Sequence, residues 1–153
     1  MYRSYYIQKN NEKDKEKKMI KNGIINPQVN YNLSLLTHLD KYLVSDSAME
    51  LPKEMTRIDL AFVPNVPDVI TVTKGILEDC LVEKAYLAKE MMEVSKELYD
   101  AYSKLFAEYN VPIEQIPHSE FCRLTKEEVR FAIRTGDTRY HYASAILVSG
   151  CPY

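Results

Sequence analysis

The sequence contains three histidines, and none of them lies within an apolar stripe. His38 follows a helical pattern, His118 follows a candidate strand, and His141 precedes the final apolar run. Imidazole titrates near neutral pH and can both donate and accept a proton, so such groups suit acid–base catalysis. Asp46 directly follows another candidate strand, and ligands of α/β sheets bind outside the carboxyl ends of strands. These positions make His38, Asp46 and His118 candidate site residues.

Each candidate also has an ordinary structural interpretation. A histidine at a helix C-terminus commonly caps the helix or lies on the surface, and an aspartate after a strand commonly caps a turn. Tyr142 is one of 12 tyrosines and could be an ordinary loop aromatic. No pair of histidines has the close spacing of zinc ligands, so the sequence does not favour a metal site. Only four glycines are present, which makes a phosphate-binding loop hard to build.

Length and charge exclude several classes of protein. The chain has 153 residues, 46% of them apolar and 27% charged, which is typical of one soluble domain. Its net charge of −2 argues against a nucleic-acid partner. No apolar run is long enough to cross a membrane, and the first 20 residues lack the apolar core of a secretory signal. Three widely spaced cysteines indicate reduced thiols, so we predict a cytoplasmic protein.

The first 18 residues differ from the rest. They carry six basic and three acidic side chains without helical or strand periodicity. We therefore predict a disordered N-terminal extension over residues 1–18 and one domain over residues 19–153. A basic arm for an acidic partner is the alternative interpretation. The Lys and Glu codons before Met19 are purine-rich, as a ribosome-binding site is, so a start at Met19 is a further hypothesis.

Turn residues and apolar spacing divide residues 19–153 into short elements. Asn26 followed by Pro27 is a helix-start signal, because a capping side chain precedes proline at the first helical position. Alternation and β-branched residues predict strands over Lys41–Ser45, Arg57–Val63, Val69–Thr73, Ile113–Ile116 and Ala145–Ser149.

Two further regions have helical patterns. Apolar residues recur at four-then-three spacing through Glu78–Tyr109, where we predict two helices with a break near Ser95. A capping box from Thr125 to Glu128 predicts a helix over Lys126–Arg134, closed by Gly136. Strands that alternate with helices predict a single-domain α/β sandwich with a largely parallel sheet.

Four stretches give the chain a family resemblance. They read MIKNGIINPQ, THLDKYLVSDSAMELPK, TRIDLAF and IRTGDTRYHYASAILVSG, in the order and near the spacing that the family shows. From residue 19 to the end, the chain resembles the family of ribose pyranases and fucose mutarotases. TRIDLAF is similar to a motif of the pyranase branch. The resemblance implies a three-layer α/β/α sandwich, a homodecameric ring, and no metal or organic cofactor.

The resemblance also implies roles for particular residues. His38 falls where the family has its proton-donating histidine, and Asp46 and His118 fall on sugar-binding positions. The triplet of Tyr142, Ala143 and Ser144 falls on a substrate-binding Tyr-Ala-Asn.

The chain departs from the family pattern at several positions. Thr37 and Ala48 replace glycines, Glu50 replaces a frequent proline, and Ser144 replaces the asparagine of the triplet. One extra residue before the triplet makes Tyr140 a rival for the tyrosine role.

The activity that the resemblance implies is interconversion of β-D-ribopyranose and β-D-ribofuranose. His38 would protonate the departing ring oxygen, and Asp46 would orient His38 or a sugar hydroxyl. His118 and Tyr142 would hold other hydroxyls and accept the anomeric proton. The alternatives are a mutarotase for another free sugar, such as L-fucose, and a non-catalytic sugar-binding or transport-accessory protein. No nucleic acid or membrane partner is expected.

Overall fold

A six-stranded mixed sheet organises the chain, and the computed structural model describes residues 22–153 of it. The disordered extension predicted over residues 1–18 and the start at Met19 lie outside the described residues. The helices are α2 (Pro27–Ser34), α3 (Val69–Asp79), α4 (Lys89–Val94), α5 (Lys96–Glu108) and α6 (His118–Glu127). The strands are β1 (Lys41–Ser45), β2 (Thr56–Asp59), β3 (Val82–Ala88), β4 (Ile113–Ile116), β5 (Val129–Arg134) and β6 (Ala145–Ser149).

The strands lie in the order β2-β5-β1-β6-β3-β4. β2, β5 and β1 are mutually parallel, and β3 is parallel to β4. β6 lies between β1 and β3 and is antiparallel to both. Five strands therefore point the same way and β6 runs against them, which confirms the largely parallel sheet.

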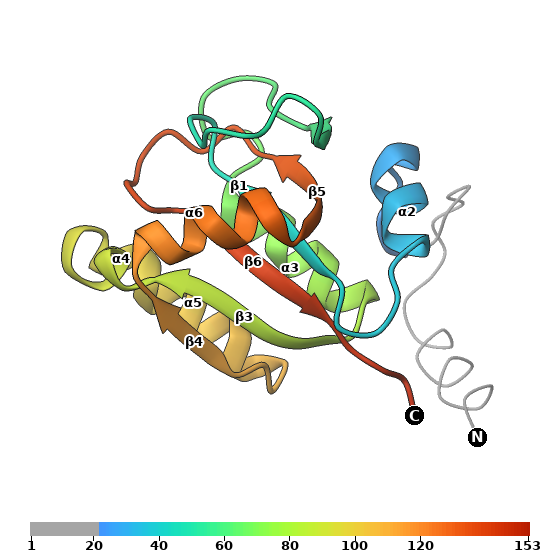
Figure 1. The fold of residues 1–153 in the computed structure, drawn as a ribbon. Helices are drawn as coiled ribbons and strands as arrows, with labels where there is room; N and C mark the ends of the chain where they lie inside the picture. The colour runs from blue at the N-terminus through green and yellow to red at the C-terminus, as the bar shows by residue number, and fades with distance from the viewer. Residues whose placement is uncertain (1–21) are drawn as a thin grey trace, which may run out of the picture.

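Helices cover both faces of the sheet, with α6 on one face and α3 and α5 on the other (Figure 1). Successive residues of a strand point to opposite faces. In β1, Tyr42 and Val44 pack with the α3 and α5 side, while Leu43 packs with Phe121 and Leu124 of α6. All three β1 residues are fully buried. The three-layer α/β/α sandwich and the single domain are thus confirmed.

Several predicted elements are confirmed. The side chain of Asn26 accepts a hydrogen bond from the Val29 amide at 2.9 Å and caps α2. The strands over Lys41–Ser45, Ile113–Ile116 and Ala145–Ser149 are β1, β4 and β6. The strand predicted over Arg57–Val63 is present as the shorter β2.

The strand predicted over Val69–Thr73 is wrong, because these residues open helix α3. Asp68 caps this helix by accepting a hydrogen bond from the Thr71 amide at 2.7 Å. The buried residues Val69, Thr73, Ile76 and Leu77 recur at helical spacing and face the sheet. Burial of this stripe outweighs the weak local preference of β-branched residues for strands.

The region Glu78–Tyr109 is only partly helical. The break at Ser95 is confirmed, since α4 ends there and α5 begins. The first part is instead strand β3, which pairs with β6 on one side and β4 on the other. Hydrogen bonding to both neighbours decides the conformation of a segment whose Glu, Lys, Ala and Leu residues also suit a helix.

The helix predicted over Lys126–Arg134 is also wrong. Thr125 is not a helix cap, because its hydroxyl donates to the Phe121 carbonyl oxygen at 2.9 Å inside α6. α6 ends at Glu127, and Val129–Arg134 forms β5 between β2 and β1. Gly136 therefore follows a strand and closes no helix. Across residues 22–153, no helix is both long and apolar enough to span a membrane.

Gly136 and Gly75 form a matched pair for a stability test. A Cβ on Gly136 would lie 2.7 Å from the Val63 carbonyl oxygen and 2.9 Å from that of Val66, whereas a Cβ on Gly75 meets nothing within 4 Å. We expect Gly136→Ala to lower the free energy of unfolding by about 1–3 kcal/mol through this overlap. Gly75→Ala, inside α3, should raise it by about 0.5–1 kcal/mol. Denaturant titration measures both, and equal effects would contradict the close approach at Gly136.

Candidate active site

The carboxyl edge of the sheet collects polar side chains from three strands that are distant in sequence. Asp46 directly follows β1, and His118 begins α6 two residues after β4. Because β6 is antiparallel to β1 and β3, the segment before it, with Tyr142 and Ser144, starts at the same edge. The edge is where α/β folds bind ligands.

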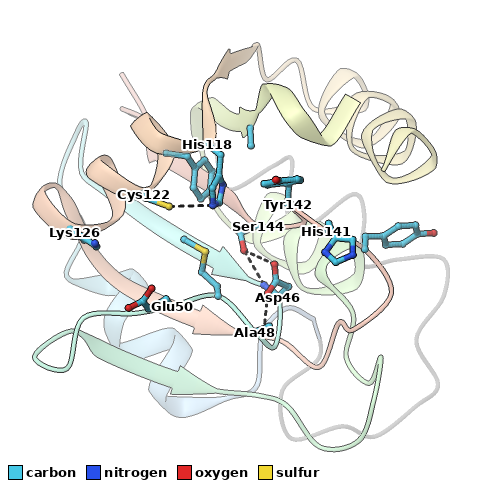
Figure 2. Close-up of a pocket in the computed structure, with 13 residues that line it drawn as sticks. Asp46, Ala48, Glu50, His118, Cys122, Lys126, His141, Tyr142 and Ser144 are labelled. Atoms are coloured by element: carbon cyan, nitrogen blue, oxygen red, sulfur yellow. Dashed lines mark hydrogen bonds between the residues drawn. The ribbon is translucent and has the colours of Figure 1, made fainter. Parts of the chain in front are cut away.

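These side chains line a cavity of about 410 Å³, a size that suits a small ligand. Figure 2 shows Asp46 and Ser144 on one side of the cavity and His118 and Cys122 on another. The lining residues are Asp46, Ala48, Met49, Glu50, Ala88, His118, Phe121, Cys122, Lys126, Tyr140, His141, Tyr142 and Ser144.

The Asp46 carboxylate is fixed by two neighbours. Its Oδ1 accepts a hydrogen bond from the Ala48 amide at 2.9 Å, and its Oδ2 accepts one from the Ser144 hydroxyl at 3.2 Å. The Asp46 amide in turn donates to the Ser144 Oγ at 3.1 Å. Each carboxylate oxygen keeps a free lone pair, so Asp46 can still accept hydrogen bonds from a ligand.

His118 is held at the start of α6 by contacts on several sides. The residue before it, Pro117, has no side chain that could cap the helix, and Glu90 of α4 accepts from the His118 amide at 3.0 Å instead. The imidazole stacks on Phe121 with ring centroids 6.3 Å apart. The Tyr142 ring packs edge-on against the imidazole, with ring centroids 4.9 Å apart. These contacts fix the ring against the cavity wall.

Cys122 and Lys126 are pocket residues that the sequence analysis missed. The Cys122 Sγ lies 3.3 Å from the His118 Nε2, while the His118 Nδ1 is buried without a hydrogen-bond partner among residues 22–153. His118, Cys122 and Lys126 are four residues apart along α6 and share one face. The missed signal is this spacing, which has meaning only if residues 118–127 form a helix. Met49, Ala88, Phe121 and His141 also line the cavity without having been predicted.

Both tyrosines of the preceding loop line the cavity, but their contacts differ. Tyr142 touches the His118 ring, whereas the Tyr140 ring lies 5.4 Å from the Arg139 guanidinium. The pKa of Tyr140 is raised by burial and by nearby Glu97. Tyr142 has a positive φ of 57°, a backbone conformation that residues other than glycine seldom adopt.

Two predicted site residues do not reach the cavity. Ala143 is fully buried in the core beneath it. His38 precedes β1, whereas Asp46 follows it, so the two residues lie at opposite edges of the sheet. The five residues of β1 alone span roughly 16 Å. The His38 side chain is 48% exposed, and its Nε2 lies 3.1 Å from a Glu83 carboxylate oxygen.

The cavity can exchange protons and hydrogen bonds with a small hydroxylated molecule. A carboxylate accepts hydrogen bonds from hydroxyl groups, while imidazole and phenol groups both donate and accept them. Lys126 is the one ammonium group among the lining residues, so the cavity lacks the cluster of cations that a phosphate ester requires. Within residues 22–153, no three His, Cys, Asp or Glu side chains are grouped to hold a metal ion.

This fold and cavity define an α/β domain with a cavity of small-molecule size at the carboxyl edge of its sheet. The chain belongs to the RbsD / FucU transport protein family, whose model matches residues 19–152. A D-ribose pyranase from Geobacillus thermodenitrificans is 35% identical over 132 residues, covering 86% of this chain and 97% of that protein. A D-ribose pyranase from Coprothermobacter proteolyticus is also 35% identical, covering 86% of this chain and 98% of the other.

Solved structures agree with this assignment. Bacillus subtilis RbsD complexed with D-ribose superposes with a TM-score of 0.81 at 32% identity, covering 88% of this chain and all of that one. The fucose mutarotase of Streptococcus pneumoniae in complex with L-fucose has a TM-score of 0.70 at 17% identity, covering 84% and 95%. The second likeness supports the fold alone.

Asp40 organises the turn that carries His38. Its Oδ2 accepts hydrogen bonds from the Thr37 amide at 2.8 Å and the Thr37 hydroxyl at 3.0 Å, and Arg130 lies 3.2 Å from its Oδ1. The Thr37 amide is the main reason that the pKa of Asp40 is lower than its ordinary value of 3.8.

We therefore expect Asp40 to stabilise the fold in a pH-dependent way. A carboxyl group with a depressed folded pKa contributes fully above its unfolded pKa and loses this contribution as pH falls through the folded value. The difference in unfolding free energy between wild type and Asp40→Asn should thus be constant near neutral pH and shrink below pH 3.8. Denaturant titrations at several pH values measure it, and a difference independent of pH would contradict the role of ionised Asp40.

Proposed function

We propose that this protein is an isomerase that interconverts β-D-ribopyranose and β-D-ribofuranose. The observation that carries the proposal is the cavity in which Asp46, His118 and Tyr142 converge, within a chain 35% identical to D-ribose pyranases over nearly their whole length. The 32% identical neighbour was solved in complex with D-ribose. A free monosaccharide also suits a cavity that contains carboxylate, imidazole and phenol groups but a single ammonium group.

The proposed reaction needs only proton transfer. To open the pyranose, the anomeric hydroxyl loses its proton while the ring oxygen gains one, and the sugar then closes through a different hydroxyl. We assign protonation of the ring oxygen to His38 and sugar binding to Asp46, His118, Tyr142 and Ser144. We also assign acceptance of the anomeric proton to His118 and Tyr142. One positioned acid or base typically contributes about 10²–10⁴-fold to the rate.

His38 can take part only if a second copy of the chain supplies it. It lies at the amino edge of the sheet, beyond β1 from the cavity, and is about half exposed. We therefore propose that the amino edge of one copy docks on the carboxyl edge of the next, so that His38 completes the neighbour's site. Contacts between two different surfaces propagate from copy to copy and form a ring when the rotation closes, as the proposed homodecamer requires.

Exposed apolar residues at both edges support this contact. Tyr31 in α2, Leu35 just after it, and Leu39, the residue that follows His38, are more than half exposed. At the other edge, in the loop after β2, Phe62 is 85% exposed and Val66 51% exposed. Large apolar side chains exposed to solvent are common at protein–protein interfaces. We also propose a cytoplasmic location, which suits the three free cysteines.

The activity can be tested by NMR exchange spectroscopy of D-ribose at equilibrium. We expect wild-type protein to transfer magnetisation between the anomeric signals of the pyranose and furanose forms. His38→Ala should slow this exchange by at least about 100-fold, because a proton donor is lost. Circular dichroism of the variant serves as the folding control. Near-normal exchange in folded His38→Ala would refute its assignment, and exchange of L-fucose rather than D-ribose would favour the mutarotase alternative.

Complementation tests whether the site is shared between copies. His38→Ala and Asp46→Asn should each be inactive alone, because each damages every site. In co-expressed mixed assemblies, about a quarter of the sites would combine an intact His38 with an intact Asp46 from the neighbour, so activity should return to that fraction. Asp46→Asn mixed with His118→Ala is the control, since both damage the same half of the site. No recovery in the first mixture would contradict the shared site.

A further inference from the structure

Two hydrogen bonds hold the backbone of the segment from His141 to Ser144. They come from the corner between α4 and α5 and from the first turns of α5. At this corner the buried Ser95 separates the two helices. Its hydroxyl donates to the His141 carbonyl oxygen at 2.8 Å. Nearly two turns into α5, the Tyr102 hydroxyl donates to the Ala143 carbonyl oxygen at 2.7 Å. The two acceptors flank Tyr142.

This pair of hydrogen bonds explains how Tyr142 can keep its left-handed backbone. A residue other than glycine with a φ of 57° is held there only when its surroundings fix it. The first bond holds the peptide group between His141 and Tyr142, and the second holds the peptide group between Ala143 and Ser144, one residue further along. Tyr102 is fully buried, and burial raises the pKa of its hydroxyl well above the ordinary value, so the group stays protonated as a donor.

The 141–144 backbone that these hydrogen bonds hold contacts both sides of the cavity. The Tyr142 ring contacts the imidazole of His118 at 4.9 Å. Two residues further along the chain, the Ser144 hydroxyl donates to the carboxylate of Asp46. The position of the 141–144 backbone therefore determines contacts with His118 and Asp46, two of the groups to which sugar binding is assigned. α4 contributes independently, since Glu90 accepts from the His118 amide.

We propose that Tyr102 and Ser95 are positioning residues for sugar binding, acting through the backbone of residues 141–144. Neither side chain lines the cavity. The inference rests on the proposed function only for the consequence in sugar affinity. The geometric part, that Tyr102 fixes the orientation of Tyr142 against His118, holds whatever ligand the cavity binds.

Tyr99 provides a matched control on the same helix. Its hydroxyl accepts a hydrogen bond from the Gln115 side chain at 2.6 Å. Within residues 22–153, this hydroxyl forms no hydrogen bond to residues 141–144. Tyr99→Phe and Tyr102→Phe each remove one hydroxyl from α5 and keep the ring. Tyr102→Phe should cost more stability than Tyr99→Phe, because it leaves the buried Ala143 carbonyl oxygen without its donor. Denaturant titration of both variants therefore accompanies the binding measurements, which are made under conditions where each variant is fully folded.

The first measurement compares kinetics. We expect Tyr102→Phe to raise KM for D-ribose about fivefold with a smaller change in kcat, because sugar contacts weaken in ground state and transition state alike. Tyr99→Phe should leave KM within about twofold of wild type. Ser95→Ala should act in the same direction as Tyr102→Phe, and it keeps the test available if Tyr102→Phe does not fold. Equal KM values for Tyr102→Phe and Tyr99→Phe would overturn the role in binding.

The second measurement needs no sugar. NMR chemical shifts of the Tyr142 and His118 ring protons report the edge-on contact directly, because an aromatic ring shifts the resonances of its neighbours. We expect these shifts to change in Tyr102→Phe and to stay at wild-type values in Tyr99→Phe. Unchanged shifts in Tyr102→Phe would overturn the geometric inference. If wild type fails to exchange ribose while the shifts respond as expected, the proposed function is wrong and the positioning role stands.

Discussion

The reversed direction of β6 is the constraint on which the candidate site depends. In an all-parallel sheet, the residues before β6 would lie at the amino edge, far from Asp46 and His118. Because β6 is antiparallel to both β1 and β3, Tyr142 and Ser144 enter the sheet at the carboxyl ends of the other strands. β6 is almost fully buried, so its direction is fixed by hydrogen bonding on two sides and by packing on both faces. The cavity is thus a product of topology as much as of local sequence.

Strong local signals in the sequence predict the elements that are least dependent on their surroundings. The Asn26–Pro27 start of α2 and the apolar runs of β1 and β6 were identified correctly because capping and continuous burial leave their mark on a few adjacent residues. Predictions failed where tertiary contacts decided the conformation. β3 has residues suited to a helix and is a strand because two neighbours pair with it, and α3 begins with residues suited to a strand and is a helix because one face packs on the sheet.

The candidate site shows the same contrast between residues found from local signals and residues placed by tertiary contacts. Asp46 and His118 could be predicted to meet because each follows a parallel strand, and such strands end at one edge. Cys122 and Lys126 could not be found, since their place depends on a helix that local patterns put several residues later. The position of Tyr142 against His118 depends on hydrogen bonds to buried hydroxyls of α5 and its N-terminus, which no local pattern in residues 140–144 encodes. His38 and Asp46 are only eight residues apart in sequence, but β1 separates them in the folded chain.

β1 has a further consequence as a spacer. It carries His38 before its first residue and Asp46 after its last, so its length sets the separation of these two residues along every copy. In the proposed ring, that separation must match the distance between successive interfaces. One inserted residue would lengthen β1 by about 3.3 Å and turn alternate side chains toward the wrong face of the sheet. In that proposed ring, the length of this five-residue strand is coupled to the geometry of the assembly, and a change in one requires a compensating change in the other.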